Sequence, residues 1–390
     1  MWLVFLLVAI YLIYGIIEYH HHAANINQIA VRIHVNGTRG KSSVTRLIGG
    51  GLKGGGKRVF VKTTGTSPRT IDVYGNEASI KRVGSANIIE QLKITRQAAA
   101  QRAEYFVVEC MALVPDLQEI SEKQMIRSTV GAITNIREDH LDVMGPTIEN
   151  VADALCNTIP ENGLLFTSEK RFADKINTRA ARLRARVISA EATNISAQDM
   201  LGFSYLEHKD NVALALSVCD HFGVDKQAAL QGMYKVQPDP GALRKFAVNL
   251  NGKSIEFVNA FAANDPDSYR EIWKMLHIHL NSEIKLFVIV NSRRDRVQRA
   301  EQLGEFIARE LQADQFIISG EATYPLHNRA LKCGLSSDKV KDLGGKSAGE
   351  IFSYIYDQTV SKSMVIGIGN IVGLGEEIAN YFINKGRMVA

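Results

Sequence analysis

RIHVNGTRGKSSVTRLIGG, residues 32–50, contains the most informative local pattern of the chain. An apolar, strand-like run leads into a turn with two glycines, which is followed by Lys41, two serines and a helical pattern. This order is typical of a phosphate-binding loop, because the N–H groups at a helix start form a cradle for anions. Val35 stands where the usual loop has its first glycine, so the predicted loop is the compressed form Gly37–Lys41. The alternative is a chance glycine turn that binds nothing.

Side chains beside this loop have the chemistry to bind a nucleotide and its metal ion. Lys41 can reach a β or γ phosphate as a point charge, and Ser42 or Ser43 can offer a hydroxyl to Mg²⁺. Glu109 ends the strand-like run YFVVE and could hold the same Mg²⁺ directly or through water. The alternative for Glu109 is a solvated carboxylate at the end of a strand.

A second polar group follows another strand-like run, in AITNIREDHLDVMGPT. The residues gathered there are Glu138, Asp139, His140 and Asp142. Carboxylate oxygens and neutral imidazole are ligands of divalent metal ions. Because ligands bind at the carboxyl ends of parallel strands, this run predicts a second metal site beside the phosphate loop. By itself, the same run could be a polar turn.

Strand-like and helix-like segments alternate along most of the chain, which predicts an α/β fold with largely parallel sheets. Apolar runs of strand length occur at 29–35, 58–63, 105–112, 128–136, 163–168, 254–261, 285–292, 315–320 and 363–370. QPDPGALR, residues 237–244, holds two prolines and a glycine and is the predicted domain boundary. We therefore expect an anchor at residues 1–19, an ATP-binding central domain at 20–240 and a smaller, Rossmann-like α/β domain at 241–390.

The first 17 residues, MWLVFLLVAIYLIYGII, carry no charge. A helix of that length spans roughly 25 Å, which suits a single membrane anchor in a thin or locally adapted bilayer. A cleaved signal peptide normally begins with a basic region, and this stretch has none. The alternatives are an uncleaved signal-like segment and a helix that packs against a partner subunit. His20, His21 and His22 follow, and an interfacial polar cuff explains them better than a metal-binding tract.

The composition argues against several classes of function. The net charge is +5, with acidic residues interspersed and no Lys/Arg block beside aromatics, so nucleic acid is not an expected partner. The four cysteines form no Cys-x-x-Cys pair, which argues against zinc sites and disulfides and favours a reducing compartment. GIGNIVG, residues 367–373, is a weak dinucleotide signal because it lies too near the C-terminus for a following βαβ unit.

Taken together, these stretches resemble the Mur ligase superfamily, which includes bacterial cell-wall peptide ligases and folylpolyglutamate synthases. The matching motifs are the loop NGTRGKSS, the strand end TNIREDHLDVMG, the helix DNVALALSVC with Asn211, the hinge PDPGALR, and the C-terminal stretches NAFAANDPDS and SRRDR. The loop follows the anchor so closely that no room is left for the nucleotide-sugar domain of the cell-wall enzymes. Within the superfamily, the chain therefore resembles the membrane-associated subunits that synthesise poly-γ-glutamate.

This resemblance implies a Mur-ligase-like central P-loop domain and an ATP-dependent amide ligase that polymerises glutamate through an acyl phosphate, with ATP and Mg²⁺ as cofactors. It implies a cell-membrane location with the catalytic body in the cytoplasm and a capsule or secreted polymer as the product. The expected partners are glutamate, the growing polymer and small integral-membrane subunits, and a homo-oligomer is a further option. Two other classes stay open: a soluble-type ligase such as folylpolyglutamate synthase, and a membrane-tethered P-loop ATPase.

The resemblance also implies roles for individual residues. The catalytic residues would be Lys41, His140 and Arg244. Nucleotide contacts would come from Asn36, Gly37, Thr38, Arg39, Gly40, Lys41, Ser42, Ser43, Asn211, Arg244 and Asp295. Metal ligands would be Ser42, Glu109 and His140, and substrate contacts would be Thr64, Thr66, Arg69, Asn264 and Arg294.

The sequence departs from the superfamily pattern at two places. Most members carry a carbamoylated lysine that bridges Mg²⁺ ions shortly after the histidine, but no lysine occurs between Leu141 and Glu169. Another group must hold the second ion, or the site has one ligand fewer. Asn259 stands where the family has an acidic residue that contacts the ribose, so that contact is not carried over.

Overall fold

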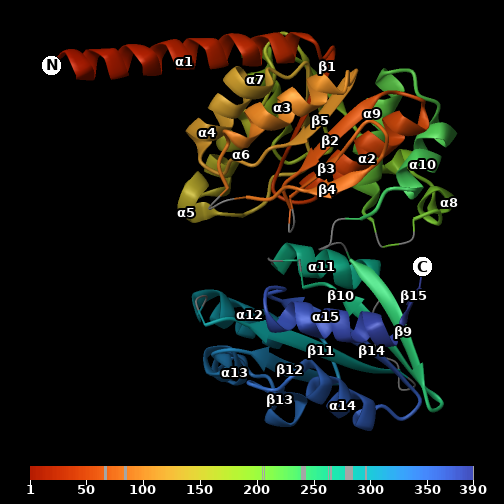
Figure 1. Cartoon of the computed structure of the whole chain (residues 1–390). Helices are drawn as coiled ribbons and strands as arrows, with labels where there is room; N and C mark the ends of the chain where they lie inside the picture. Colours follow the sequence, from red (N-terminus) through yellow and green to blue (C-terminus); the bar gives the residue numbers. More distant parts are fainter. Residues whose placement is uncertain are drawn as a thin grey trace. The chain divides into compact units, whose positions relative to one another are not determined.

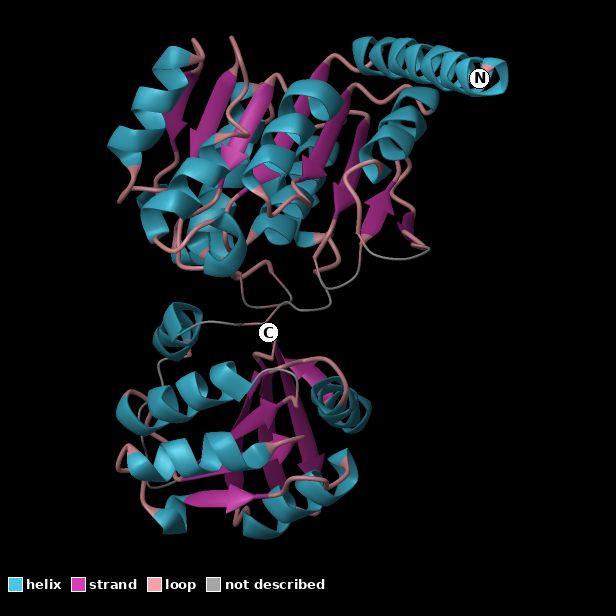
Figure 2. Cartoon of the chain, turned by 90° about the vertical axis from the view of Figure 1, so that its left-hand side faces the viewer, coloured by secondary structure: helices cyan, strands magenta, loops and turns pink. Residues whose placement is uncertain are grey.

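The computed structural model describes residues 1–65, 68–82, 86–203, 205, 207–238, 243–261, 263, 266–276, 284–294 and 297–389. The chain forms two compact units (Figure 1): unit 1 comprises residues 1–203 and 207–239, and unit 2 comprises residues 204–206 and 240–390. In each unit, helices cover both faces of a central sheet (Figure 2). The α/β fold class predicted from the alternating segments is confirmed.

The sheet of unit 1 has β1, the strand before the phosphate loop, near its centre. Among the described residues its order is β4-β3-β2-β5-β1-β6-β7-β8. The bounds are β1 (Val31–Asn36), β2 (Val59–Thr63), β3 (Arg69–Ile71), β4 (Glu77–Ser79), β5 (Tyr105–Glu109), β6 (Val130–Ile133), β7 (Leu164–Thr167) and β8 (Arg186–Ser189). β3 and β4 form an antiparallel hairpin, whereas the other strands are parallel. The parallel strands therefore all begin at one end of the sheet, the amino end, and finish at the opposite, carboxyl end.

Helices connect these strands and bury both faces of the sheet. Their bounds are α1 (Trp2–Asn27), α2 (Lys41–Gly54), α3 (Glu90–Ala100), α4 (Pro115–Ile120), a π-helix (Ser121–Ile126), α5 (Leu141–Met144), α6 (Ile148–Cys156), α7 (Ala173–Arg182), a 3₁₀ turn (Ala192–Asn194), α8 (Ala197–Met200), α9 (Lys209–His221) and α10 (Lys226–Tyr234). Phe60 of β2 shares an apolar cluster with Ile94 of α3, whereas its neighbour Val61 faces Gly49 of α2. This burial on both faces explains why the strands read as continuous apolar runs.

α1 continues beyond the apolar stretch that the sequence analysis identified and ends at Asn27. Its large apolar side chains between Trp2 and Tyr19 are exposed, and the helix is long and apolar enough to cross a membrane. His22 and Ile26, one helical turn apart, are buried against unit 1, and His22 Nε2 lies 2.8 Å from the Met125 carbonyl oxygen. The three histidines therefore do not form one polar cuff, because helical geometry turns His22 inward while His20 and His21 stay exposed.

Unit 2 is built around a second sheet, whose order among the described strands is β13-β12-β11-β14-β10-β9-β15. The strands are β9 (Arg244–Leu250), β10 (Lys253–Asn259), β11 (Ile284–Ser292), β12 (Gln315–Gly320), β13 (Val340–Asp342), β14 (Lys362–Gly369) and β15 (Arg387–Val389). The helices are α11 (Pro266–Met275), α12 (Val297–Arg309), α13 (Thr323–Lys332), α14 (Ala348–Gln358) and α15 (Leu374–Lys385), with a 3₁₀ turn at Ser337–Lys339. β9 pairs antiparallel with β10 at the edge of a parallel, doubly wound core, and β15 pairs antiparallel with β9.

α2 and α10 approach so closely that glycine is required at their contact. A Cβ at Gly232 of α10 would lie 2.1 Å from the Gly50 carbonyl oxygen and 2.9 Å from the Gly54 Cα atom. The run IGGGLKG is a poor helix former by composition, but it is helical here because this packing stabilises it. The contact fixes the position of α2, whose first turn carries the residues of the phosphate loop motif.

Gly232→Ala should lower the free energy of unfolding of unit 1 by about 1–3 kcal/mol, because the new methyl group must displace backbone atoms of α2. Urea unfolding followed by circular dichroism measures this change. Gly349→Ala in α14 is the control, since the nearest atom to its new methyl lies at 3.5 Å, an ordinary van der Waals distance. A Gly232→Ala protein as stable as the wild type would contradict the close helix contact.

Candidate active site

The predicted phosphate loop connects β1 to α2 at the carboxyl end of the unit 1 sheet. Gly37 and Gly40 have φ angles of 135° and 77°, which residues with a side chain rarely adopt. A Cβ at Gly37 would lie 2.0 Å from Thr134 Oγ1, and one at Gly40 would lie 2.7 Å from Asn211 Oδ1. Only glycine therefore fits at both positions, and the loop backbone leads directly into the start of α2.

Residues that follow β6 hold this loop in place. Thr38 Oγ1 donates to Asn135 Oδ1 at 2.7 Å, and the Arg39 backbone N–H donates to the same oxygen at 3.1 Å. Thr134 Oγ1 and Asn135 Nδ2 both donate to the Arg39 carbonyl oxygen, at 2.6 and 3.1 Å. These bonds fix the loop backbone in one conformation, which reduces the entropy that phosphate binding would otherwise cost.

Lys41 begins α2, and its ammonium group lies over the loop. Its Nζ donates to the carbonyl oxygen of Gly37 at 2.7 Å and to that of Thr38 at 3.3 Å. The amino terminus of α2 adds the positive end of a helix dipole at the same place. A cationic side chain, a helix start and a fixed glycine loop together suit a polyphosphate group.

Glu109, the last residue of β5, joins the loop motif to a neighbouring strand. Its Oε2 accepts hydrogen bonds from Ser42 Oγ at 2.8 Å and from the Thr64 backbone N–H at 2.6 Å. Glu109 is 2% exposed, yet within the described residues no cationic side chain lies within ion-pairing distance of it. A buried carboxylate is costly without a counter-charge, and carboxylate and hydroxyl oxygens are the ligands that Mg²⁺ prefers. Ser42 and Glu109 therefore fit a magnesium ion.

His140 and its acidic neighbours do not form the preformed metal cluster that the sequence suggested. His140 Nε2 lies 3.8 Å from Asp139 Oδ1, and that oxygen lies 3.3 Å from Arg39 Nη2. Glu138 and Asp142 are exposed, because the chain turns into α5 at this point. Throughout the described part of the chain, no group of three or more His, Cys, Asp and Glu side chains is arranged to hold a metal ion. A metal-binding role for His140 stays a prediction.

Two predicted nucleotide contacts have well-defined protein partners. Asn36 Nδ2 donates to Gln118 Oε1 at 2.8 Å and to Thr158 Oγ1 at 3.1 Å, so its side chain braces the end of β1. Asn211 on α9 is buried beside the phosphate loop, and its Nδ2 donates to Glu207 Oε1 at 2.8 Å. Asn36 therefore holds the end of β1, and Asn211 packs against the loop at Gly40. Their contacts with a nucleotide stay predictions.

The predicted substrate residues of unit 1 lie around the hairpin and the end of β2. Arg69 Nε lies 3.4 Å from Glu77 Oε1, which also accepts a hydrogen bond from Arg46 Nη2 at 2.7 Å. Ser43, which is instead a predicted nucleotide contact, is half-buried in the first turn of α2. Thr64 contributes its backbone N–H to Glu109, as described above, and Thr66 lies outside the described residues.

The predicted residues of unit 2 are only partly described. Arg244 is the first residue of β9, and Arg294 is exposed just after β11. Asn264 and Asp295 lie outside the described residues. Asn259 ends β10, and its Oδ1 accepts the Phe261 backbone N–H at 3.4 Å, so this amide shapes the following turn. The roles of these side chains toward ATP and substrate stay predictions.

A buried ion pair that the sequence analysis missed lies in the strand before the loop. His34 of β1 is fully buried, and its Nδ1 lies 2.7 Å from Oε2 of Glu122 in the π-helix. Oε1 of Glu122 accepts hydrogen bonds from the Ser128 backbone N–H and hydroxyl, at 2.9 and 2.8 Å. Burial alone would lower the pKa of His34, but hydrogen bonding to Cys110 and Glu122 raises it to about 10. The sequence feature that could have indicated this ion pair is a histidine inside the apolar run RIHV.

A second missed group is the buried cation Lys62 at the carboxyl end of β2. Its Nζ lies 3.0 Å from Glu90 Oε1, and Arg82 donates to both oxygens of Glu90, at 2.7 and 3.0 Å. Burial lowers the pKa of Lys62, although the charges of Glu90 and Glu109 oppose the shift. Lys62 is therefore a buried amine near the site that pairs with Glu90, and the sequence feature that could have indicated it is a lysine inside a buried strand.

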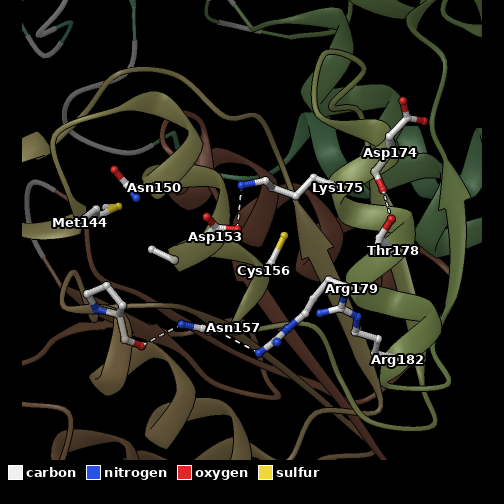
Figure 3. Close-up of a pocket in the computed structure, with 12 residues that line it drawn as sticks. Met144, Asn150, Asp153, Cys156, Asn157, Asp174, Lys175, Thr178, Arg179 and Arg182 are labelled. Atoms are coloured by element: carbon white, nitrogen blue, oxygen red, sulfur yellow. Dashed lines mark hydrogen bonds and ion pairs between the residues drawn. The ribbon is translucent and has the colours of Figure 1, made fainter.

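A cavity of about 720 Å³ lies between α6 and α7 and is lined by none of the phosphate-loop residues (Figure 3). Lys175 Nζ lies 2.7 Å from Asp153 Oδ1, and Arg179 Nη2 donates to Asn157 Oδ1 at 3.3 Å. These polar contacts link the two helices to each other. The cavity is therefore separate from the predicted phosphate loop.

Comparison with known families agrees with this geometry. The family model described as the Mur ligase middle domain matches residues 35–237, and that of the poly-gamma-glutamate synthase CapB C-terminal domain matches residues 245–385. The chain belongs to the Mur ligase family. PGA synthase CapB of Bacillus subtilis (strain 168) is 35% identical over 380 residues, which cover 97% of this chain and 96% of that protein. Capsule biosynthesis protein CapB of Bacillus anthracis is 38% identical over 376 residues, covering 96% and 81%.

Solved Mur ligase structures share the fold at low sequence identity. MurF from Acinetobacter baumannii is 17% identical with a TM-score of 0.66, and the match covers 94% of this chain and 79% of that one. A Mycobacterium tuberculosis folylpolyglutamate synthase, solved in complex with ADP, is 16% identical with a TM-score of 0.66, covering 94% and 93%. The Mur ligase fold therefore extends over almost the whole chain, and the predicted resemblance to this family is confirmed.

His34→Gln should remove a pH-dependent part of the stability. The pKa of His34 is about 10 in the folded chain and 6.5 for an ordinary histidine, so its charge stabilises the fold fully below pH 6.5. That contribution is lost as the pH rises through 10. The difference in unfolding free energy between wild type and variant, measured by urea unfolding, should therefore shrink with rising pH. His21→Gln, at an exposed position, is the control. A pH-independent difference would mean that the pKa of His34 is not raised in the folded chain.

Proposed function

We propose that this chain is an ATP-dependent amide ligase that joins glutamate units into poly-γ-glutamate, as a capsule or secreted polymer. The observation that carries the proposal is the fixed Gly37–Lys41 loop beside the buried Ser42–Glu109 oxygen pair. It occurs in a chain that matches PGA synthase CapB over nearly its whole length. The ADP complex of a folylpolyglutamate synthase with the same fold supports ATP as the phosphoryl donor.

The chemistry requires activation of a carboxylate, because its leaving group in a direct reaction with an amine would be an oxide ion. A carboxylate oxygen of the acceptor attacks the γ phosphorus of ATP, the bond to the β,γ-bridging oxygen breaks, and ADP leaves. The amine of the incoming glutamate then attacks the acyl carbon, loses a proton and expels inorganic phosphate. Negative charge moves in both steps, so positioning and electrostatic stabilisation are the main tasks of the protein.

The residues of the loop serve the first step. The backbone N–H groups of Gly37–Lys41 and the amino terminus of α2 would hold the β and γ phosphates. Lys41, whose ammonium group lies over the loop, would offset the charge on the transferred phosphoryl group. Ser42 and Glu109 would hold Mg²⁺, which supplies further charge neutralisation at the phosphate oxygens.

The other residue assignments extend this proposal. His140 would be a ligand of a second Mg²⁺, and Asn211 would support the nucleotide beside the loop. Arg244 would bind ATP, while Arg69 and Arg294 would bind carboxylates of glutamate or of the growing chain. Guanidinium groups suit these tasks because they donate two parallel hydrogen bonds to a phosphate or carboxylate group.

α1 would anchor the proposed enzyme in the cell membrane. Its exposed apolar side chains and its length suit a single span, and the catalytic units would lie in the cytoplasm, where ATP is available. A polymer that forms a capsule must cross the membrane as it grows. We infer that small integral-membrane subunits are the partners of this chain and receive the product.

The direct test is synthesis by membranes that contain this chain and candidate partner subunits. With ATP, Mg²⁺ and labelled glutamate, they should form a polymer that ordinary proteases do not digest, because its amide bonds run through the γ-carboxyl groups. A membrane-tethered ATPase would instead release ADP at the same rate with and without glutamate. That result would reject the ligase.

Lys41→Ala should reduce glutamate-dependent ADP release by at least about 100-fold, because the charge on the transferred phosphoryl group loses its cation. A coupled assay for ADP in the same membranes measures the rate. Lys93→Ala, at an exposed position of α3, is the matched control and should leave the rate unchanged. Full activity of the Lys41→Ala protein would remove the loop from the mechanism.

Glu109→Gln should raise the Mg²⁺ concentration for half-maximal activity by roughly 10–100-fold, because a buried carboxylate ligand becomes a neutral amide. A Mg²⁺ titration of glutamate-dependent ADP release measures this shift. Glu104→Gln is the control, since Glu104 directly precedes the same strand at its opposite end and is exposed. An unchanged Mg²⁺ requirement in the Glu109→Gln protein would exclude Glu109 as a ligand.

A further inference from the structure

The cavity between α6 and α7 has a row of cationic side chains on one wall. Lys175, Arg179 and Arg182 of α7 all line it, and they follow one another at intervals of four and three residues. Residues at these intervals lie on one face of a helix. Figure 3 shows Lys175 and Arg179 extending from α7 toward α6. We refer to Lys175, Arg179 and Arg182 as the α7 cations.

The two arginines among them keep unused capacity to bind an anion. Arg182 is exposed, and its side chain forms no hydrogen bond or ion pair with the described residues. Arg179 donates from Nη2 to Asn157 Oδ1 at 3.3 Å, but its Nε is buried and lacks a hydrogen-bond partner in the described part of the chain. A buried donor without a partner costs free energy, so a ligand that accepts a hydrogen bond from it is favoured.

Two carboxylates also line the cavity, but neither pairs with these arginines. Asp153 of α6 lies 2.7 Å from Lys175 Nζ, so it offsets the charge of that lysine. Asp174 is exposed, and Figure 3 shows its carboxylate directed away from the α7 cations. The charges of Arg179 and Arg182 are therefore available to an anion that enters the cavity.

The same cavity has an apolar lining, which comes from Pro115, Met144, Ala154 and Cys156. Met144, Ala154 and Cys156 belong to the buried core of unit 1. Burial raises the pKa of the Cys156 thiol to about 11, so this group is neutral and adds to the apolar lining. A ligand that carries both carboxylates and methylene groups would therefore find partners for each.

The spacing of the α7 cations suits a linear polymer of γ-linked glutamate. With a rise of about 1.5 Å per residue, successive cations lie about 6 and 4.5 Å apart along the helix. A γ-linked glutamyl unit has five backbone atoms, so its α-carboxylates repeat about every 6 Å in an extended chain and at shorter intervals in a bent one. Each unit also contributes two methylene groups that can cover the apolar lining.

The cavity extends away from the end of the sheet that carries the phosphate loop. α7 connects the parallel strands β7 and β8, so it begins at the carboxyl end of the sheet and ends at the amino end. Lys175 therefore lies toward the phosphate loop end and Arg182 toward the opposite end. Met144, four residues after His140, lines the same cavity. A polymer bound along the α7 cations thus leads away from the place where we propose that it is made.

We propose that this cavity binds the growing poly-γ-glutamate chain, with α-carboxylates on Arg179 and Arg182 and methylene groups on the apolar lining. The inference rests on the proposed polymer product. Because the cavity is lined by none of the phosphate-loop residues, it would hold a segment that has already been made. The bound segment keeps the chain attached to the enzyme between successive additions of glutamate.

The test measures binding of a fluorescent oligo-γ-glutamate to the full chain in phosphatidylcholine nanodiscs, without ATP. R179Q/R182Q should weaken the binding roughly tenfold, because two charged contacts are lost. K93Q/R96Q on α3 is the matched control, since these cations are also three residues apart on a helix and exposed, and the net charge falls by the same amount. The control should change the affinity by less than about twofold. Equal losses in the two variants would show attraction by net charge alone and would overturn the proposal.

Two further measurements exclude misfolding and locate the ligand. R182Q alone removes no contact within the described residues, so it should fold as the wild type does and still weaken the binding roughly threefold. Hydrogen exchange of α6 and α7 should be slower when the oligomer is bound to the wild type. Protection confined to other segments would overturn the proposal. Protection of α7 by inorganic tripolyphosphate but not by the oligomer would assign the cavity to phosphate and would reject it as well.

Polymer length separates this inference from the proposed ligase activity. In membranes with the partner subunits, R179Q/R182Q should make shorter polymer, because weaker binding acts mainly on the rate of release. Its initial rate of glutamate-dependent ADP release should equal that of the wild type, since the phosphate loop is unchanged. Polymer of unchanged length would contradict the retention of the chain in this cavity. Absence of glutamate-dependent ADP release from the wild type would instead reject the ligase, and the binding measurement would still decide whether the cavity takes the polymer.

Discussion

The candidate site depends on the close contact between the phosphate loop and the strand ends around it. Gly37 packs against Thr134 with no room for a Cβ, and Asn135 binds the backbone of the loop through both its amide oxygen and its amide nitrogen. The Ser42–Glu109 hydrogen bond ties the loop to a further strand. Because β1, β5 and β6 are adjacent in the sheet, these contacts fix the N–H groups at the start of α2 in one direction. Such a fixed set of N–H groups suits the polyphosphate that we propose as the ligand.

Much of the fold could be predicted because its signals are local. Strands buried on both faces read as apolar runs, and the two glycines of the loop mark a turn that only glycine can make. Glu109 stands out in the sequence because it ends such a run, and its role as a metal ligand stays a prediction. The resemblance to the Mur ligases rests on the same short stretches, and the comparisons with known proteins confirm it.

Interactions between distant segments could not be predicted in this way. His34 and Glu122 are 88 residues apart, and their pairing depends on a π-helix that no local sequence pattern indicates. Conversely, proximity in sequence predicts a metal cluster around His140, but the turn into α5 leaves Glu138 and Asp142 exposed, and Asp139 pairs with Arg39. The α7 cations look like ordinary surface charges until the fold places them along one wall of a cavity.

We propose that the loop directs the terminal phosphoryl group of ATP to a carboxylate oxygen. The most direct measurement uses an acceptor whose carboxylate oxygens are labelled with ¹⁸O, together with ATP, Mg²⁺ and glutamate. If an acyl phosphate forms, the labelled oxygen that bridges carbon and phosphorus leaves with the phosphate, so mass spectrometry should find one ¹⁸O atom in each phosphate released. Phosphate without the label, formed at the same rate as the amide bond, would contradict the account.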